Sequence, residues 1–183
     1  MSYSLLAKRL RLPLGFALAA LYLVFARPTP RVLLLGASVA FVGLVIRAWA
    51  SGHIMKNDRL ATTGPYAHTR NPLYFGSFLI AAGFALAAHW SLLLLVAAFF
   101  ALIYVPTMQR ERANIAGRFP EAYAEYARNV PAFVPRVTPW RGGDDAPARG
   151  FSRSLYMKHG EWKAALGFAG ALTVLLLRMR GVV

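Results

Sequence analysis

Five long apolar blocks, each nearly free of charge, limit the folds that this chain can adopt. They span residues 12–26, 32–50, 72–88, 91–106 and 162–177. A membrane-spanning helix needs roughly 20 apolar residues, and about 17 are tolerated when flanking residues extend the span. Because 57% of the 183 residues are hydrophobic and only 15% are charged, five buried helices of a water-soluble domain would be unusual. The blocks therefore predict an all-α, polytopic membrane helix bundle of about five transmembrane helices.

The chain is expected to form one integral membrane domain over residues 1–183, multi-pass and with its N-terminus in the cytoplasm. The first block is expected to be retained, since no small-residue cleavage site follows it. Transmembrane helices are expected at about 12–26, 32–50, 72–88, 91–107 and 162–178, with cytoplasmic segments at 51–71 and 108–161. This topology places 16 of the 21 Lys and Arg residues inside and four outside, with Arg47 near the inner end of its helix, as the positive-inside rule requires.

The formal net charge of +14 raises the question of a nucleic-acid partner, since basic patches bind phosphate without sequence preference. Positive flanks that face an anionic inner leaflet explain most of this charge, and the partner that they indicate is the membrane bilayer. The four histidines lie in separate segments and the chain has no cysteine, so the sequence predicts no metal site. No nucleic-acid partner is predicted either.

A polar, ring-rich loop turns directly into an apolar helix at residues 63–76. Asn71 is a strong N-cap residue, Pro72 suits the first helical position, and the apolar run begins at Leu73. The free backbone donors of such a helix N-terminus can hold an anion. The pattern is typical of a well-capped helix, and it also suits a polar cofactor site at a membrane face.

The third and fourth apolar blocks are separated only by residues 89–91, which predicts a tight helical hairpin. Arg70 and Glu111 flank this hairpin and are expected to be neighbours. Four tyrosines lie in the same zone, and rings, a cation and a helix N-terminus suit a ligand with an aromatic base, a cation and a carboxylate. S-adenosylmethionine has all three, although aromatic residues are also common at membrane interfaces.

A longer pattern resembles the superfamily of isoprenylcysteine carboxyl methyltransferases and phospholipid methyltransferases. It runs from residues 60–76 through Glu111, Phe119, Tyr123 and Tyr126 to the Val-Pro-Ala-Phe-Val-Pro segment at 130–135. The resemblance implies a membrane enzyme that binds S-adenosylmethionine between the two polar segments and methylates a lipophilic small molecule, lipid or prenylated substrate by direct displacement. The candidate catalytic residues are Arg70, which could hold a carboxylate acceptor, and Glu111, which could take a proton from an amine. The candidate cofactor-binding residues are Gly64, Tyr66, His68, Asn71, Pro72, Tyr74, Tyr123 and Tyr126.

The chain departs from the superfamily pattern at two positions. Asn71 stands where relatives usually have a histidine, and Arg112 stands where a second glutamate is common. Asn71 can cap a helix or bind a ligand, but it cannot act as a base. Two alternatives therefore stay open: a membrane reductase of the sterol type that uses NADPH, and a non-catalytic lipid-binding protein of the same fold.

The sequence also contains two stripes of small residues, at Gly36–Ala40 and Gly167–Ala171. Such stripes allow helices to approach closely. They serve packing within a bundle as readily as packing between chains.

Overall fold

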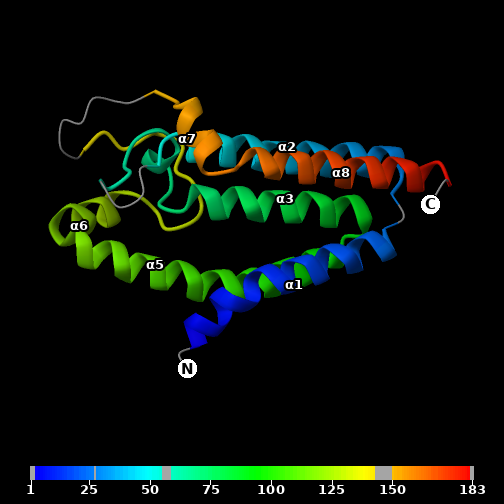
Figure 1. Cartoon of the computed structure of the whole chain (residues 1–183), viewed down its shortest axis with the longest axis horizontal. Coiled ribbons are helices and arrows are strands. Elements are labelled where there is room, and N and C mark those ends of the chain that lie inside the picture. The colour runs from blue at the N-terminus through cyan, green and yellow to red at the C-terminus, as the bar shows by residue number, and fades with distance from the viewer. Residues whose placement is uncertain (1–2, 27, 55–58, 143–149, 182–183) are drawn as a thin grey trace.

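The computed structural model describes residues 3–26, 28–54, 59–142 and 150–181. All regular secondary structure in these residues is helical (Figure 1). The elements are α1 (Tyr3–Phe25), α2 (Pro30–Ser51), the 3₁₀ turn η1 (Gly64–Ala67), α3 (Pro72–Ala88), α4 (Leu92–Phe99), the π-helical turn η2 (Phe100–Tyr104), α5 (Val105–Arg118), α6 (Pro120–Asn129), α7 (Arg153–Lys158) and α8 (Trp162–Met179).

Three of the helical stretches are long and apolar enough to cross a membrane. They are α2, the continuous helix Leu92–Arg118, and α8, while α3 is apolar but has only 17 residues. The helix α1 begins at Tyr3, so Arg9 and Arg11 lie within it ahead of its apolar part. The all-helical prediction and the suitability for a membrane are confirmed, and the number of five transmembrane helices stays a prediction.

The helices α2 and α3 pack backbone to backbone at two glycine pairs. A Cβ atom added at Gly36 would lie 2.3 Å from the carbonyl oxygen of Gly83, and one added at Gly43 would lie 2.5 Å from that of Gly76. The reverse additions, at Gly83 and Gly76, meet the carbonyl oxygens of Gly36 and Gly43 at 2.4 Å and 2.6 Å. The stripe that begins at Gly36 therefore serves packing within the chain.

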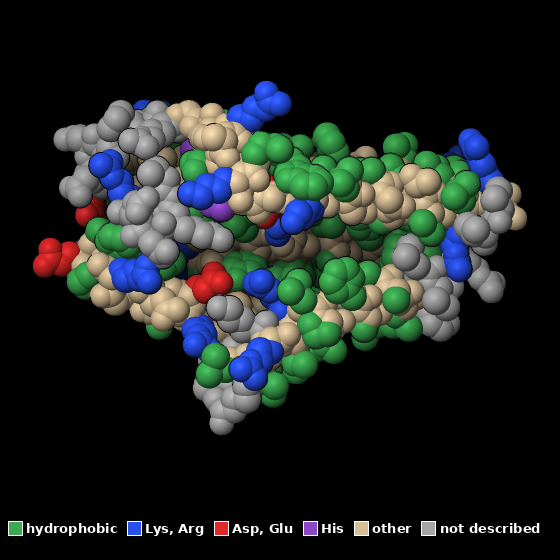
Figure 2. Space-filling model, viewed as in Figure 1, with side chains coloured by type: hydrophobic (Ala, Val, Ile, Leu, Met, Phe, Trp, Pro, Cys, Tyr) green, Lys and Arg blue, Asp and Glu red, His purple; other side chains and the backbone are tan. Residues whose placement is uncertain are grey.

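The helices α1 and α5 form a second layer below α3 in Figure 1, where they lie side by side, whereas α8 lies along α2 in the upper layer. Both layers meet at the end of the bundle where α1 leads into α2. The core there consists of Tyr22, Ala26, Leu33, Ala87 and Leu175. Toward the opposite end the face shown in Figure 2 is hollowed between the layers, and Lys and Arg side chains gather there.

The helix that begins at Leu92 continues to Arg118, past the apolar block that ends at residue 106. Its π-helical turn at Phe100–Tyr104 widens the helix in the middle, which is a feature common near functional sites. Residues 120–129 open on a proline, which predicts a short helix there, and α6 begins at Pro120 and ends at Asn129. The sequence of residues 141–147, rich in Gly and Asp, predicts a flexible linker; this segment lies mostly outside the described residues.

Candidate functional site: a polar and an apolar cavity

An extended strap, residues 130–140, supports the candidate site by pairing with the loop that precedes α3. Three backbone hydrogen bonds join them: Arg70 donates to Pro131, Arg136 donates to His68, and Trp140 donates to Ala67, at 2.9, 2.9 and 3.0 Å. Prolines at every fourth position of the strap, 131, 135 and 139, exclude helix there. The Val-Pro-Ala-Phe-Val-Pro segment thus holds the residue 66–71 loop in place.

Asn71 occupies the N-cap position of α3, but its side chain does not cap the helix. Its Nδ2 atom donates instead to the carbonyl oxygen of Ala132 in the strap at 2.8 Å. The neighbouring Thr69 is buried and donates its hydroxyl to the carbonyl of Phe133 at 2.9 Å. The prediction of an Asn71 side-chain cap is therefore wrong, because two long-range hydrogen bonds to the strap take the side chains of this loop.

A cavity of about 440 Å³ opens between this loop, the C-terminal half of α5 and the start of α6. We call it the polar cavity. It is lined by Ile54, Arg59, Leu60, Ala61, Tyr66, Arg70, Asn71, Met108, Glu111, Arg112, Asn114, Ile115, Arg118, Phe119, Tyr123 and Tyr126. Arg70 and Glu111 both face it, as the hairpin argument predicted.

The polar cavity brings six of the ten predicted site residues together, namely Tyr66, Arg70, Asn71, Glu111, Tyr123 and Tyr126. The other four do not line it. Gly64 adopts a positive φ of 59° beside the ring of His53, and His68 hydrogen-bonds through Nδ1 with the Arg136 carbonyl. Pro72 is buried at the start of α3. Tyr74 lies behind Glu111 and donates its hydroxyl to that carboxylate at 2.8 Å.

Two buried polar atoms of the polar cavity have no hydrogen-bond partner in the protein. They are the hydroxyl of Tyr66, a residue with 6% of its surface exposed, and Nε of Arg70. Arg70 uses Nη1 to donate to the Tyr123 hydroxyl at 3.2 Å, and Tyr126 donates to the backbone carbonyl of Tyr66 at 2.6 Å. Since buried polar groups are nearly always paired, the two unpaired atoms mark a place for a polar ligand.

The charge around the polar cavity favours an anionic group in the ligand. Four arginines line it, at positions 59, 70, 112 and 118, against the single carboxylate of Glu111. Burial raises the pKa of the Tyr66 phenol, and the negative charges of Glu161 and Glu111 raise it further. Tyr66 therefore stays a neutral hydroxyl that can donate or accept a hydrogen bond.

The two buried phenols outside the apolar layer predict a loss of stability at alkaline pH. Burial raises the pKa of Tyr126 as well as that of Tyr66. Below the unfolded-state pKa, near 10, both states keep these protons, whereas above it only the unfolded chain releases them. The free energy of unfolding should then fall with rising pH, by about 1.4 kcal/mol per pH unit for each phenol.

Thermal unfolding of the detergent-purified protein between pH 8 and 11 measures this slope. Tyr126→Phe should remove one of the two phenols, so the part of the slope above pH 10 that the two phenols cause should fall by about half. An unchanged slope in that variant would show that Tyr126 titrates in the same way in both states.

Sequence reasoning missed the contribution of α5 around Glu111. Met108, Asn114 and Ile115 line the polar cavity together with Glu111. Residues three and four apart share a face of a helix, so their spacing from Glu111 was a usable signal. Arg59 carried no comparable signal in the sequence.

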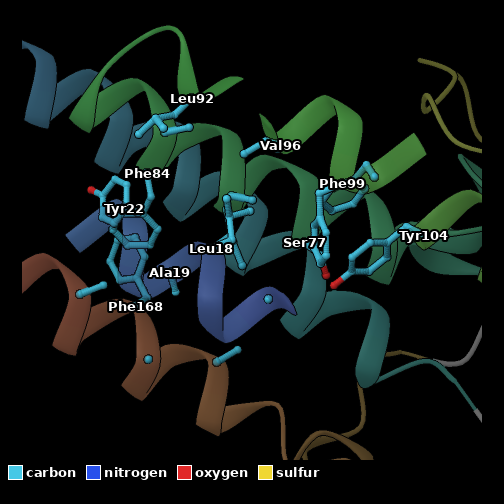
Figure 3. Close-up of a pocket in the computed structure, with 18 of the residues that line it drawn as sticks. Leu18, Ala19, Tyr22, Ser77, Phe84, Leu92, Val96, Phe99, Tyr104 and Phe168 are labelled. Carbon is cyan, nitrogen blue, oxygen red and sulfur yellow. The ribbon is translucent and has the colours of Figure 1, made fainter. Parts of the chain in front are cut away.

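A second cavity, of about 410 Å³, lies within the helical layers and is almost entirely apolar. We call it the apolar cavity. Its walls come from α1, α3, α4, η2 and α8, and Figure 3 shows the rings of Tyr22, Phe84 and Phe168 at one end. At the other end the hydroxyls of Ser77 and Tyr104 point toward one another, and Arg47 lines the cavity as well.

The described residues include no group of three or more His, Cys, Asp or Glu side chains that could hold a metal ion.

Comparison with known proteins matches the central part of the chain to a protein family. The sequence matches the phospholipid methyltransferase family over residues 32–122, from the start of α2 into α6. Residues 32–122 belong to the phospholipid methyltransferase family. This membership agrees with the resemblance found in the sequence, and α8 lies outside the matched residues.

Two relatives are named as metal-resistance proteins. The chain is 40% identical to the cobalt-zinc-cadmium resistance protein CzcN of Cupriavidus metallidurans over 112 residues, which are 60% of this chain and 50% of the relative. It is 35% identical to the nickel-cobalt-cadmium resistance protein NccN of Alcaligenes xylosoxydans xylosoxydans over 129 residues, which are 69% of this chain and 54% of the relative. The chain thus spans about half the length of these two proteins. No solved structure matches it.

Proposed function

We propose that this protein is an S-adenosylmethionine-dependent methyltransferase that acts on a lipophilic acceptor, in the manner of the isoprenylcysteine carboxyl methyltransferases. One observation carries the proposal: a polar cavity with an unpaired Tyr66 hydroxyl and an unpaired Arg70 Nε lies near an apolar cavity between the helices. Tyr74 links the two, because its hydroxyl donates to Glu111 of the polar cavity and its ring packs against Tyr104 of the apolar cavity, with the ring centroids 5.4 Å apart. A polar methyl donor and an apolar acceptor would each find a matching cavity, and their reactive ends would meet between the two.

The residues of the polar cavity fit the three parts of S-adenosylmethionine. The guanidinium of Arg70 suits the cofactor carboxylate, the carboxylate of Glu111 suits its cationic groups, and the rings of Tyr123 and Phe119 suit the adenine. When bound, the cofactor supplies a methyl group on a sulfonium centre. The protein then has to align donor and acceptor and to exclude water.

The placement of Arg70 changes the role that the sequence favoured for it. Arg70 lines the polar cavity and not the apolar one, so we assign it to the cofactor carboxylate and not to the acceptor. Glu111 also faces the polar cavity, and its carboxylate accepts the Tyr74 hydroxyl. A carboxylate acceptor would need no general base, so the absence of a histidine at position 71 would not prevent methyl transfer to oxygen.

The four arginines of the polar cavity favour one other candidate, the NADPH-dependent reductase, because arginine is well suited to phosphate. Calorimetric titration of the detergent-purified protein with S-adenosylhomocysteine and, separately, with NADPH distinguishes the candidates. Micromolar binding of S-adenosylhomocysteine alone would support the methyltransferase. Binding of NADPH alone would establish the reductase, and binding of neither would favour a non-catalytic lipid-binding protein.

We propose that the polar cavity and the N-terminus face the cytoplasm in an integral membrane protein. The natural absence of cysteine allows a clean test with single substitutions. Arg128→Cys on α6 should resist a membrane-impermeant maleimide in intact cells, whereas Trp90→Cys at the exposed hairpin tip, 68% exposed in the native residue, should react. The opposite labelling pattern would reverse the orientation.

A further inference from the structure

The apolar cavity contains one charged residue among the described residues that line it, Arg47 of α2. A charged side chain inside a membrane layer is costly and is generally functional. The backbone of α3 makes room for it, because a Cβ atom added at Gly76 would lie 2.7 Å from Cγ of Arg47. The side chain thus passes along α3 to the end of the cavity where Ser77 lies.

The guanidinium of Arg47 is held by a carboxylate from a helix far away in the sequence. Its Nε donates to Oε2 of Glu161 at 3.0 Å, and its Nη2 lies 2.7 Å from both carboxylate oxygens. Nη1 donates to the Leu73 carbonyl at 3.2 Å and to the Ser77 hydroxyl. The side chains of Arg47 and Glu161 are only 22% and 13% exposed.

This ion pair lies beside the first turn of α3, close to the polar cavity. Arg47 donates to the carbonyl of Leu73, two residues after Asn71, which lines the polar cavity. The charges of Glu161 and Arg47 also act on the pKa of the Tyr66 phenol, which lines the same cavity. Arg47 lines the apolar cavity, but Glu161 does not. The member of the ion pair that an occupant of the apolar cavity meets is therefore the guanidinium of Arg47, at the end of the cavity where Ser77 lies.

We infer that Arg47 is the residue that selects the acceptor by its carboxylate headgroup, and that Glu161 takes the headgroup's place when the cavity is empty. The inference rests on the proposed function, which implies an apolar acceptor with a carboxylate, and it assigns the residue that recognises that group. The carboxylate of Glu161 shows that such a group fits the guanidinium through two parallel hydrogen bonds. A methyl ester product would be neutral and would lose this attraction to Arg47. The ion pair between Arg47 and Glu161 would then form again.

The inference predicts a preference for an acid over its ester that depends on Arg47. The probes are cis-parinaric acid, a fluorescent single-chain fatty acid, and its methyl ester, detected by energy transfer from tryptophan in uncharged detergent micelles. The wild-type protein should bind the acid about tenfold more tightly than the ester. Glu161→Gln should strengthen binding of the acid by about threefold or more, because the competing carboxylate is gone.

The double variant Arg47→Gln/Glu161→Gln removes both charges and so leaves no unpaired charge buried. It should bind the acid and the ester equally, at the level of the ester in the wild type. Equal binding of acid and ester by the wild type, or an equal loss of both in the double variant, would overturn the inference.

A second pair of variants tests the cavity without touching the ion pair. Gly167 lines the apolar cavity and Gly170 does not, and a Cβ atom added at either meets nothing within 4 Å. Gly167→Leu should weaken both probes by about tenfold by filling the cavity, whereas Gly170→Leu should leave both unchanged. Equal effects of the two substitutions would place the probes elsewhere and overturn the inference.

These measurements need no methyl donor, so they are separate from the test of the proposed function. Loss of the acid preference together with intact S-adenosylhomocysteine binding would refute the role of Arg47 and leave the methyltransferase proposal standing. An acid preference without S-adenosylhomocysteine binding would support the role of Arg47 and refute the methyltransferase proposal.

Discussion

Replacing Gly83 by alanine is expected to lower the free energy of unfolding by at least about 3 kcal/mol, which is the upper part of the range for overpacked interiors. The added Cβ atom would lie 2.4 Å from the Gly36 carbonyl oxygen and 2.5 Å from the Ala40 backbone nitrogen. Both are backbone atoms of α2, so no side-chain rotation relieves the overlap. The whole of α2 would have to move away from α3.

The matched control is Gly117→Ala on α5. A Cβ atom at Gly117 meets nothing within 4 Å, and alanine favours a helix over glycine by roughly 0.5–1 kcal/mol. The same substitution should therefore destabilise at position 83 and stabilise at position 117. Thermal unfolding in detergent, followed by circular dichroism, measures both, and a neutral Gly83→Ala would show that α2 and α3 are not in backbone contact.

The elements that the sequence predicted well are those whose signals are local. Pro120 opens α6 and the strap prolines follow it, so the bounds 120–129 can be read from consecutive residues. The packing partner of Gly36 could not be predicted, because the stripe of small residues Gly36–Ala40 does not show which helix it contacts. The short helix α7 was not predicted either; it docks at the end of α2, where Ser152 donates its backbone N–H to Gly52.

The contacts of the candidate site also fall into those that the sequence could predict and those that it could not. Arg70, Glu111 and Tyr123 could be brought together from the sequence because a hairpin connects their segments, and all three line the polar cavity. The position of the Asn71 side chain could not be predicted from the sequence, because its hydrogen-bond partner is the Ala132 carbonyl, 61 residues later. The pair of Arg47 and Glu161 is separated by 114 residues, and only the isolated arginine in an apolar block pointed to it.

The arrangement of the cavities accounts for features that the sequence left unconnected. The strap fixes the loop that carries Tyr66 and Arg70, and the glycine pairs fix α3 against α2, which carries Arg47. The walls of the proposed donor and acceptor sites are thus attached to the same helix pair. A loss of contact between α2 and α3 should therefore impair both binding sites together.

Replacing Arg70 by alanine is expected to weaken binding of S-adenosylhomocysteine by about a hundredfold. The proposed contact joins a guanidinium to the cofactor carboxylate, and a charged hydrogen bond of this kind contributes up to about 3 kcal/mol. The side chain is held ready for such a contact, because Nη1 donates to the Tyr123 hydroxyl while the buried Nε has no protein partner. Calorimetric titration of the detergent-purified variant measures the change.

Arg128→Ala is the matched control, since Arg128 is exposed on α6 and does not line the polar cavity. It removes the same charge from the same end of the molecule and should change the affinity by less than about twofold if surface charge is screened as usual. The result also separates the two roles that an arginine here can have. If Arg70→Ala binds S-adenosylhomocysteine as the wild type does but loses methyl transfer, Arg70 contacts the acceptor and not the cofactor. A hundredfold loss of binding would assign it to the cofactor and leave Arg47 as the cation that faces the acceptor.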